Sequence, residues 1–244
     1  AKTDESTRNF LHQYMTLTRC DLFFADAAIL VEGTSERLLL PRMIKMIDAE
    51  IDTGKDSLGS RYLSTVEVGG AYAHIFFDLL TFLELKTLVI TDIDTVKKTD
   101  DHEQRVACQV RHGQFTSNAC IKQWFNDSDV RPTDLLAANE NAKTIGYRRI
   151  AFQLPEEEGG PCGRSFEDAF MLANPSKYSF LNLSMEETER QAWKNAQSLK
   201  KSEFALELAL NNEKWVCPRY IGEGLRWLAE HAVAAPVSTP VAVV

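Results

Sequence analysis

The sequence lacks the cysteine patterns of a disulfide framework or a structural zinc site. Its 244 residues include five cysteines, which is an odd number, and no two of them have the CxxC spacing. Small disulfide-rich domains and zinc ribbons depend on paired, closely spaced cysteines. We therefore expect free thiols and a cytoplasmic location, where thiols stay reduced.

Long apolar runs and an excess of positive charge are missing as well. No run approaches the ~20 apolar residues that cross a membrane, and no charged-then-apolar signal peptide opens the chain. We expect no membrane partner. The net charge of −8 argues against a generally basic surface that coats nucleic acid. Nucleic-acid binding through cations and a local basic groove stays open, because bound cations invert the local electrostatics.

The chain has the apolar periodicity of an α/β fold. Strand patterns at 27–31, 62–68 and 86–91 alternate with helical patterns at 34–49 and 71–83, and a later strand pattern covers 147–154. This order predicts a parallel sheet flanked by helices. Thr34 or Ser35 is expected to cap the first helix, and Pro41 is expected to bend or restart it. The first part of 95–114 reads as a loop. Further helices are predicted at 118–125, 132–139, 165–172, 185–210 with a break near Lys200, and 222–235.

Acidic residues follow two of the predicted strands. Glu32 lies at the carboxyl end of the first strand, and Glu36 lies in the first turn of the next helix. Asp92 and Asp94 follow the third strand, and their spacing of two points both carboxylates to one side. Sites in open α/β sheets form beyond the carboxyl ends of the strands. We therefore expect the two strand ends to meet.

Carboxylates that converge without histidine or thiol favour hard divalent cations such as Mg²⁺ or Mn²⁺. Such ions support phosphodiester chemistry, in which one activates water and a second stabilises the leaving oxygen. A single Asp-x-Asp is also common in solvated loops. The pairing of this motif with a strand-end glutamate two crossovers earlier favours the metal site.

These motifs resemble the TOPRIM domain of topoisomerases, primases and certain nucleases, through Val31-Glu-Gly33 and Asp92-Ile-Asp94. The surrounding sequence is similar to the OLD (overcoming lysogenization defect) family of nucleases. The segments that carry this second resemblance are residues 24–41 (FADAAILVEGTSERLLLP), 66–74 (VEVGGAYAH), 86–94 (KTLVITDID), 116–118 (TSN), 166–170 (FEDAF) and 201–205 (KSEFA).

The resemblance implies a role for each matching residue. Glu32, Glu36, Asp92 and Asp94 would hold metal, with Glu32 a candidate general base, and Glu167, alone or with Asp168, would complete a second metal site. Lys201 would stabilise charge on the phosphate, with Lys200 as the adjacent alternative. Glu167 and Asp168 also suit a helix cap, and a helix lysine is ordinarily solvated. Which carboxylate acts as base stays open.

The resemblance also implies a longer protein. In the family an ABC-type ATPase domain precedes the TOPRIM region, and this chain, which starts at Ala1, has no Walker motif. We interpret residues 1–21 as a lead-in from that missing domain, 22–155 as the TOPRIM core, and 163–215 as a helical domain. Residues 216–244 would form a returning helix and a flexible tail. We expect no nucleotide bound by this fragment; a homo-oligomer is compatible with the sequence, which does not define the oligomeric state.

The predicted function is a DNA endonuclease with two divalent cations. Candidate contacts to DNA phosphates are Thr116, Ser117, Asn118, Arg105 and Lys122; capping of the next helix is the other interpretation of the first three. The alternatives are a TOPRIM-type DNA-binding module, or a topoisomerase- or primase-like domain, without independent nuclease activity. No companion motif of a topoisomerase or primase is visible. A phosphatase or phosphotransferase of the Asp-x-Asp type is disfavoured, because such enzymes use the first Asp as nucleophile near the chain start and this sequence does not offer that arrangement.

Overall fold

A five-stranded sheet forms the centre of the computed structural model, which describes residues 20–51, 57–99, 104–211 and 213–230. The strand order is β2-β1-β3-β8-β7. Neighbouring strands are parallel except at β7, which pairs antiparallel with β8 at one edge. The predicted α/β fold is confirmed, with this antiparallel edge as a correction. The strands are β1 (Ala27–Val31), β2 (Leu63–Glu67), β3 (Thr87–Ile90), β7 (Thr144–Ile145) and β8 (Arg148–Ala151).

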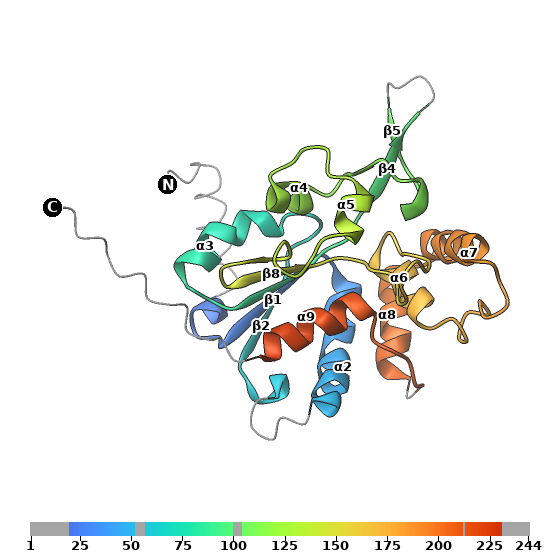
Figure 1. Cartoon of the computed structure of the whole chain (residues 1–244). Helices are drawn as coiled ribbons and strands as arrows, with labels where there is room; N and C mark the ends of the chain where they lie inside the picture. The colour runs from blue at the N-terminus through green and yellow to red at the C-terminus, as the bar shows by residue number, and fades with distance from the viewer. Residues whose placement is uncertain (1–19, 52–56, 100–103, 212, 231–244) are drawn as a thin grey trace.

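Helices cover both faces of the sheet (Figure 1). On one face, α2 (Thr34–Glu50) and α9 (Arg219–Ala229) contact the strands, and α6 (Phe166–Ala173) and α8 (Lys201–Leu210) join the same core by packing against α2. The other packs against η3 (Ala73–Phe76), α3 (Phe77–Phe82), α4 (Ala119–Phe125) and α5 (Pro132–Leu136). Because side chains alternate along a strand, Ile29 enters the first core while Leu30 enters the second. The remaining helical elements are η1 (Cys20–Phe23), η2 (Leu58–Ser60), η4 (Val110–His112) and α7 (Met185–Ser198).

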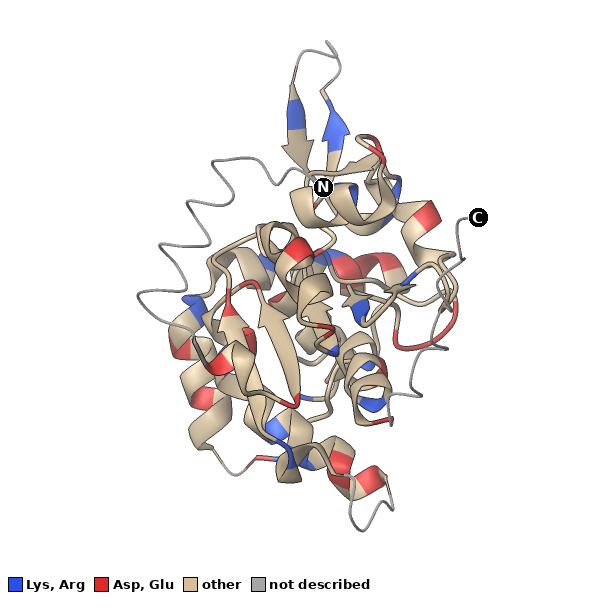
Figure 2. Cartoon of the chain, turned by 90° about the vertical axis from the view of Figure 1, so that its left-hand side faces the viewer, with Lys and Arg blue, Asp and Glu red and all other residues tan. Residues whose placement is uncertain are grey.

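A second, three-stranded antiparallel sheet follows Asp94 directly, where the sequence predicted a loop. Its order is β5-β4-β6, with β4 (Thr95–Lys98), β5 (Arg105–Ala107) and β6 (Phe115–Thr116). The β4–β5 hairpin projects from the body, and both of its strands carry basic residues (Figure 2). These strands are short and largely polar, so they carry little of the apolar alternation that identifies a strand.

Several helix boundaries differ from the prediction. The residue that caps α2 is Gly33, and no side chain caps this end. The helix continues through Pro41 without a break. It is held by apolar contacts along its length, which offset the backbone hydrogen bond that proline cannot donate. Helix α9 begins at Arg219 and ends at Ala229, so its predicted bounds were wrong at both ends, and 231–244 lie outside the described residues.

Other predictions hold in the structure. Asn118 caps α4, and α7 and α8 are separate helices with the break at 199–200. Cys108, Cys120, Cys162 and Cys217 are free thiols, and the first three of them are buried. Across the described ranges, no helix combines the length and the apolar character that a membrane span requires.

Candidate metal centre

Strand pairing brings the two predicted strand ends together. β1 and β3 are direct neighbours, with Leu30 opposite Val89. Two residues further along each strand, the register places Glu32 beside Thr91. Thr91 Oγ1 donates a hydrogen bond to Glu32 Oε1, which joins the two ends across the top of the sheet. The sheet therefore creates the contact that the sequence pattern predicted.

Asn118 fixes Glu32 from a third element, the N-terminus of α4. Its side chain is 1% exposed, and its Nδ2 donates to Glu32 Oε1 at 2.7 Å, to Thr91 Oγ1 at 2.9 Å and to the Asp92 carbonyl at 2.8 Å. Its Oδ1 accepts from Ile121 N at 3.1 Å as the helix cap. One amide group thus holds the glutamate, the end of β3 and the start of α4 in a fixed relation.

The two aspartates have different environments. Asp92 is buried, and its Oδ1 accepts from Gln153 Nε2 at 2.6 Å. Asp94 is half-buried and has a left-handed backbone, with φ of 51°. Its Oδ1 lies 2.9 Å from an Arg164 terminal nitrogen, and its carbonyl accepts from Ser117 Oγ at 2.9 Å. The turn after β3 is therefore held by contacts on both sides.

The helical region adds a buried carboxylate and a lysine. Glu167, in the first turn of α6, is 1% exposed, and its Oε1 accepts from Ser35 Oγ at 3.0 Å. Lys201 Nζ lies 2.9 Å from Glu167 Oε2. Lys200 instead pairs with Glu203 at 3.0 Å and is largely exposed. The structure therefore places Lys201, rather than its neighbour, against the carboxylates.

Burial is the main cause of the raised pKa values of these carboxylates, and their mutual charge adds to it. Burial raises the pKa of Glu36 to about 7, and the charges of Glu167 and Glu32 add to this shift. The pKa of Asp92 is raised well above its usual value by burial and then by Glu32 and Glu36. Burial also raises the pKa of Glu32, with a contribution from Asp94 and opposition from its bonds to Thr91 and Asn118.

The pKa of Lys201 is also raised, which for a lysine favours the charged form. Burial opposes its charge, but Glu167, Asp92 and Glu36 raise its pKa overall. Glu167, Asp92 and Glu36 come from α6, the end of β3 and α2, so one cation interacts with groups from three elements. Like charges brought this close favour binding of a further cation, because it relieves their repulsion.

The chemistry of the site fits hard divalent cations, although its side chains are turned toward protein donors. Within the described ranges, no three His, Cys, Asp or Glu side chains converge at metal-binding spacing. Glu32, Asp92 and Asp94 are bonded to Asn118, Gln153 and Arg164 respectively. Glu167 Oε2 is buried and has an ion pair but no hydrogen bond of good geometry. An all-oxygen donor set with an under-satisfied buried carboxylate oxygen suits Mg²⁺ or Mn²⁺.

The predicted phosphate contacts lie in distinct environments. Thr116 is buried, and its Oγ1 donates to the Ile93 carbonyl at 2.5 Å, while Asn118 is engaged as described above. Ser117 is exposed and lies next to the Asp94 carbonyl. Arg105 lies on β5, stacks on Phe115 and pairs with Asp129 at 2.8 Å, and Lys122 is half-buried on α4. Of the three residues 116–118, only Ser117 is exposed to solvent.

Asp168, which was expected to help complete the second metal site or to cap a helix, accepts hydrogen bonds from the backbone N–H groups of Arg164 and Ser165, so it organises the start of α6. The spacing of Ser165 and Asp168 is the local signal of this cap. Other residues that shape the site were not predicted from the sequence. Thr91, Gln153, Ser35 and Arg164 carry no such local signal, because their contacts join segments far apart in the chain.

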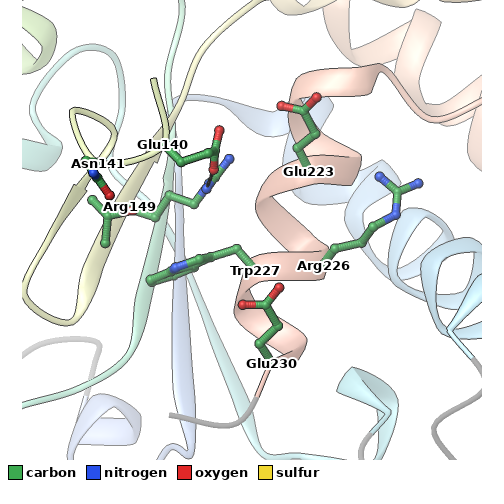
Figure 3. Close-up of a pocket in the computed structure, with 8 residues that line it drawn as sticks. Glu140, Asn141, Arg149, Glu223, Arg226, Trp227 and Glu230 are labelled. Carbon is green, nitrogen blue, oxygen red and sulfur yellow. Dashed lines mark hydrogen bonds and ion pairs between the residues drawn. The ribbon is translucent and has the colours of Figure 1, made fainter. Parts of the chain in front are cut away.

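A separate hollow of about 700 Å³ lies between the β7–β8 hairpin and α9 (Figure 3). Glu140, Arg149 and Trp227 are among the residues that line it, and none of the predicted metal-binding carboxylates does. Glu140 forms an ion pair with the buried Arg149. This hollow is therefore not part of the candidate metal centre.

The first part of the described chain matches a known domain family. The family described as "Overcoming lysogenization defect protein-like, TOPRIM domain" matches residues 23–94. The chain thus contains an OLD-like TOPRIM domain, as its motifs predicted. The matched range includes Glu32, Glu36, Asp92 and Asp94 and ends before Glu167 and Lys201.

A characterised relative is similar over a longer range. The chain is 28% identical over 251 residues to "Endonuclease GajA" of Bacillus cereus (strain HuB5-5). The match covers 93% of this chain but only 34% of that protein, so the chain spans about a third of the relative's length. Similarity to an endonuclease therefore extends through α6 and α8, beyond the TOPRIM domain.

Proposed function

We propose that this chain is the catalytic region of a DNA endonuclease that depends on Mg²⁺ or Mn²⁺. The observation that supports this most directly is the mutual electrostatic influence of carboxylates from separate elements, with Lys201 among them. The similarity to an endonuclease supports the choice of reaction. An ATPase domain elsewhere in a longer protein is part of the proposal, since the relative is about three times as long.

The positions of the carboxylates in the fold support a division between two cations. Glu32, Asp92 and Asp94 lie at the ends of β1 and β3, whereas Glu36 lies on α2, where the charge of Glu167 on α6 raises its pKa further. When bound, the ions would activate water and stabilise the negative charge that develops on the phosphate. We assign Glu32, Asp92 and Asp94 to one ion, and Glu36 and Glu167 to the other.

The protein's own groups supply the remaining chemistry. Glu32 is our candidate general base, because its raised pKa favours acceptance of a proton from the attacking water. Its Oε1 is bonded to Thr91 and Asn118, which fixes the carboxylate for that transfer. Lys201 stays protonated and would stabilise the pentavalent phosphate through its charge. The water oxygen forms the new bond to phosphorus, and the bridging P–O bond to the leaving strand breaks.

The test is cleavage of supercoiled plasmid by the purified chain in Mg²⁺, in Mn²⁺ and in chelator. We expect nicked and linear products only with metal, and a loss of at least 100-fold in rate for Asp92→Asn and for Lys201→Ala. Lys200→Ala is the matched control and should retain near-wild-type activity, because that residue pairs with Glu203.

Product analysis separates this function from its competitors. Hydrolysis gives free ends and no protein–DNA adduct, whereas a topoisomerase-like activity gives a covalent intermediate that denaturant traps. DNA binding that persists in Asp92→Asn, with no cleavage by the wild type in either metal, would show a binding module and contradict the endonuclease assignment.

A further inference from the structure

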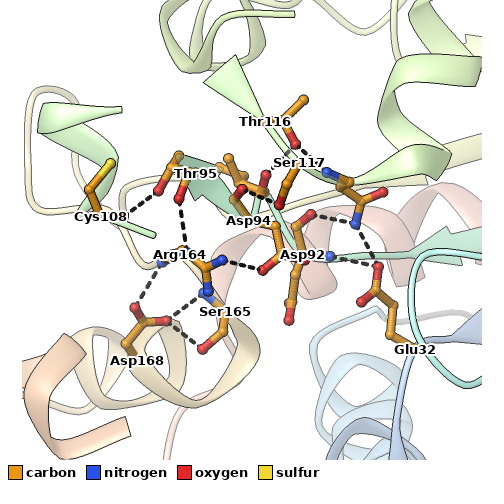
Figure 4. Close-up of polar contacts among 12 residues, drawn as sticks. Glu32, Asp92, Asp94, Thr95, Cys108, Thr116, Ser117, Arg164, Ser165 and Asp168 are labelled. Atoms are coloured by element: carbon orange, nitrogen blue, oxygen red, sulfur yellow. Dashed lines mark hydrogen bonds and ion pairs between the residues drawn. The ribbon is translucent and has the colours of Figure 1, made fainter. Parts of the chain in front are cut away.

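Arg164 is a second basic side chain at the carboxylate cluster. It lies just before α6, and its guanidinium reaches back to the turn after β3 (Figure 4). One terminal nitrogen lies 2.9 Å from Asp94 Oδ1, and Nε donates to the Thr95 carbonyl at 3.1 Å. Its side chain is 20% exposed, so it is shielded from bulk water without being closed off from it.

The backbone of Arg164 is attached to the same turn. Its carbonyl accepts from Asp94 N at 3.2 Å, and its own N–H donates to Asp168 Oδ2 at 2.9 Å. Asp168 is 2% exposed and is anchored at the start of α6. The guanidinium is therefore presented by a fixed backbone, which limits the conformational entropy that an arginine loses on binding.

Arg164 and Lys201 contact different members of the carboxylate cluster. Among the described lysines and arginines, these two form the ion pairs with the five candidate ligands: Arg164 with Asp94, and Lys201 with Glu167. Lys201 comes from α8, whereas Arg164 comes from the segment before α6. A phosphate bound among these carboxylates would thus have a cation from each of two directions.

We propose that Arg164 binds the phosphate of the DNA strand at this site. Its pair with Asp94 and the bond from Nε to the Thr95 carbonyl hold the guanidinium beside the carboxylates. From this position its terminal N–H groups would donate to a non-bridging phosphate oxygen. Arginine suits this task because its planar fork offers several donors to a phosphate. The inference rests on the proposed nuclease function.

The test compares Arg164→Ala and Arg164→Lys with the wild type, with Arg190→Ala as control, since Arg190 pairs only with Glu187 on the exposed side of α7. Binding of a short duplex is measured in Ca²⁺ over a series of NaCl concentrations, with cleavage monitored on gels. Mn²⁺ binding without DNA is measured by calorimetry. We expect about 10-fold weaker DNA binding for Arg164→Ala and a salt slope smaller by about one.

Mn²⁺ binding should stay equal or become tighter in Arg164→Ala, because the variant removes a cation that competes for Asp94. Arg164→Lys keeps the positive charge, so the dependence of its DNA affinity on salt should match that of the wild type. This variant also provides the comparison if Arg164→Ala does not fold. Unchanged DNA affinity together with weaker Mn²⁺ binding would show that Arg164 only orients Asp94, and would overturn the inference. A wild type that neither binds nor cleaves DNA with metal would instead overturn the proposed function.

Discussion

At the scale of single residues, the candidate centre holds charges in an unfavourable arrangement. Glu36 is 5% exposed, and its pKa of about 7 is raised by burial and by neighbouring carboxylates. An isolated protein gains no stability from such a group. Groups of this kind occur where a ligand or reaction uses the charge, so the site should be less stable without its cations than with them.

Glu36→Gln should stabilise the metal-free protein at alkaline pH. The unfolded chain has the ordinary pKa of 4.5 at this residue, and the folded chain has about 7. Between these values the folded state retains a proton that the unfolded state has lost, so wild-type stability falls as pH rises from about 4.5 to about 7 and stays lowered above. Glutamine does not titrate, so the variant does not lose this stability as the pH rises. We expect it to be about 1–3 kcal/mol more stable than wild type at pH 8.

The measurement is urea unfolding in chelator at pH 5 and pH 8. Glu50→Gln, at an exposed position on the same helix, is the control and should change stability by less than about 0.5 kcal/mol. If Glu36→Gln were no more stable than the wild type at pH 8, the raised pKa of Glu36 in the folded protein would be disproved.

Residue-level prediction from sequence succeeded where a local rule applied. Glu32 and Asp92 were placed correctly because parallel strands end at one edge of the sheet. Arg164 and Gln153 were missed, since their contacts depend on how the segment after β8 returns to β3. Thr34 and Ser35 were expected to cap α2, but their hydroxyl groups instead donate to Glu67 and Glu167.

At the scale of elements, α9 packs closely on the central strands through a glycine. A Cβ added at Gly224 would lie 2.7 Å from Leu88 Cδ1 and 3.4 Å from Ala151 Cβ. Leu88 is fully buried on β3 and has no room to move. The helix therefore approaches the sheet at a distance that only glycine permits, behind the strands whose ends carry Glu32 and Asp92.

Gly224→Ala should destabilise the protein by about 1–3 kcal/mol, because the added methyl group overpacks a rigid core. Gly222→Ala is the matched variant two residues earlier in the same helix. Its Cβ would meet first the flexible end of Arg226 at 3.3 Å, so the gain in helix propensity should dominate, at about 0.5–1 kcal/mol. Thermal and urea unfolding of both variants tests this, and equal effects at the two positions would contradict the packing argument.

Element prediction depended on apolar periodicity. The α7–α8 break and the start of α6 carried clear signals in capping residues and helical pattern. The β4–β6 sheet did not, because its strands are two to four residues long and all three residues of β5 are exposed. Strands of this kind are defined by their partners in the folded chain, and a single sequence does not contain that information.

At the scale of the whole molecule, the centre joins the TOPRIM domain to the helical region. Ser35 on α2 donates to Glu167 on α6 and lies 3.4 Å from the carbonyl of Lys201 on α8. Helices α2 and α8 also pack against each other. Cations bound between Glu36 and Glu167 would add a further link between these two parts of the fold.

Mn²⁺ should therefore stabilise the intact chain. A ligand that binds only the folded state, present at 100 times its Kd, adds about 2.7 kcal/mol. We expect a rise in Tm with Mn²⁺ that is largely lost in Glu167→Gln and retained in Glu203→Gln, whose exposed carboxylate pairs with Lys200. Differential scanning calorimetry measures the Tm with and without Mn²⁺. If Mn²⁺ raised the Tm of Glu167→Gln as much as that of the wild type, Glu167 would not be a metal ligand.

The distance in sequence between the two halves of the centre has a consequence for synthesis. Ser35 and Lys201 are separated by 166 residues. Chains fold from the N-terminus as they emerge from the ribosome, so the strand ends bearing Glu32 and Asp92 can form long before α6 and α8 exist. A nascent chain would then hold four of the five candidate carboxylates but neither Glu167 nor Lys201. Under the proposed function, a nascent chain in contact with DNA carries no competent nuclease until α8 has been synthesised.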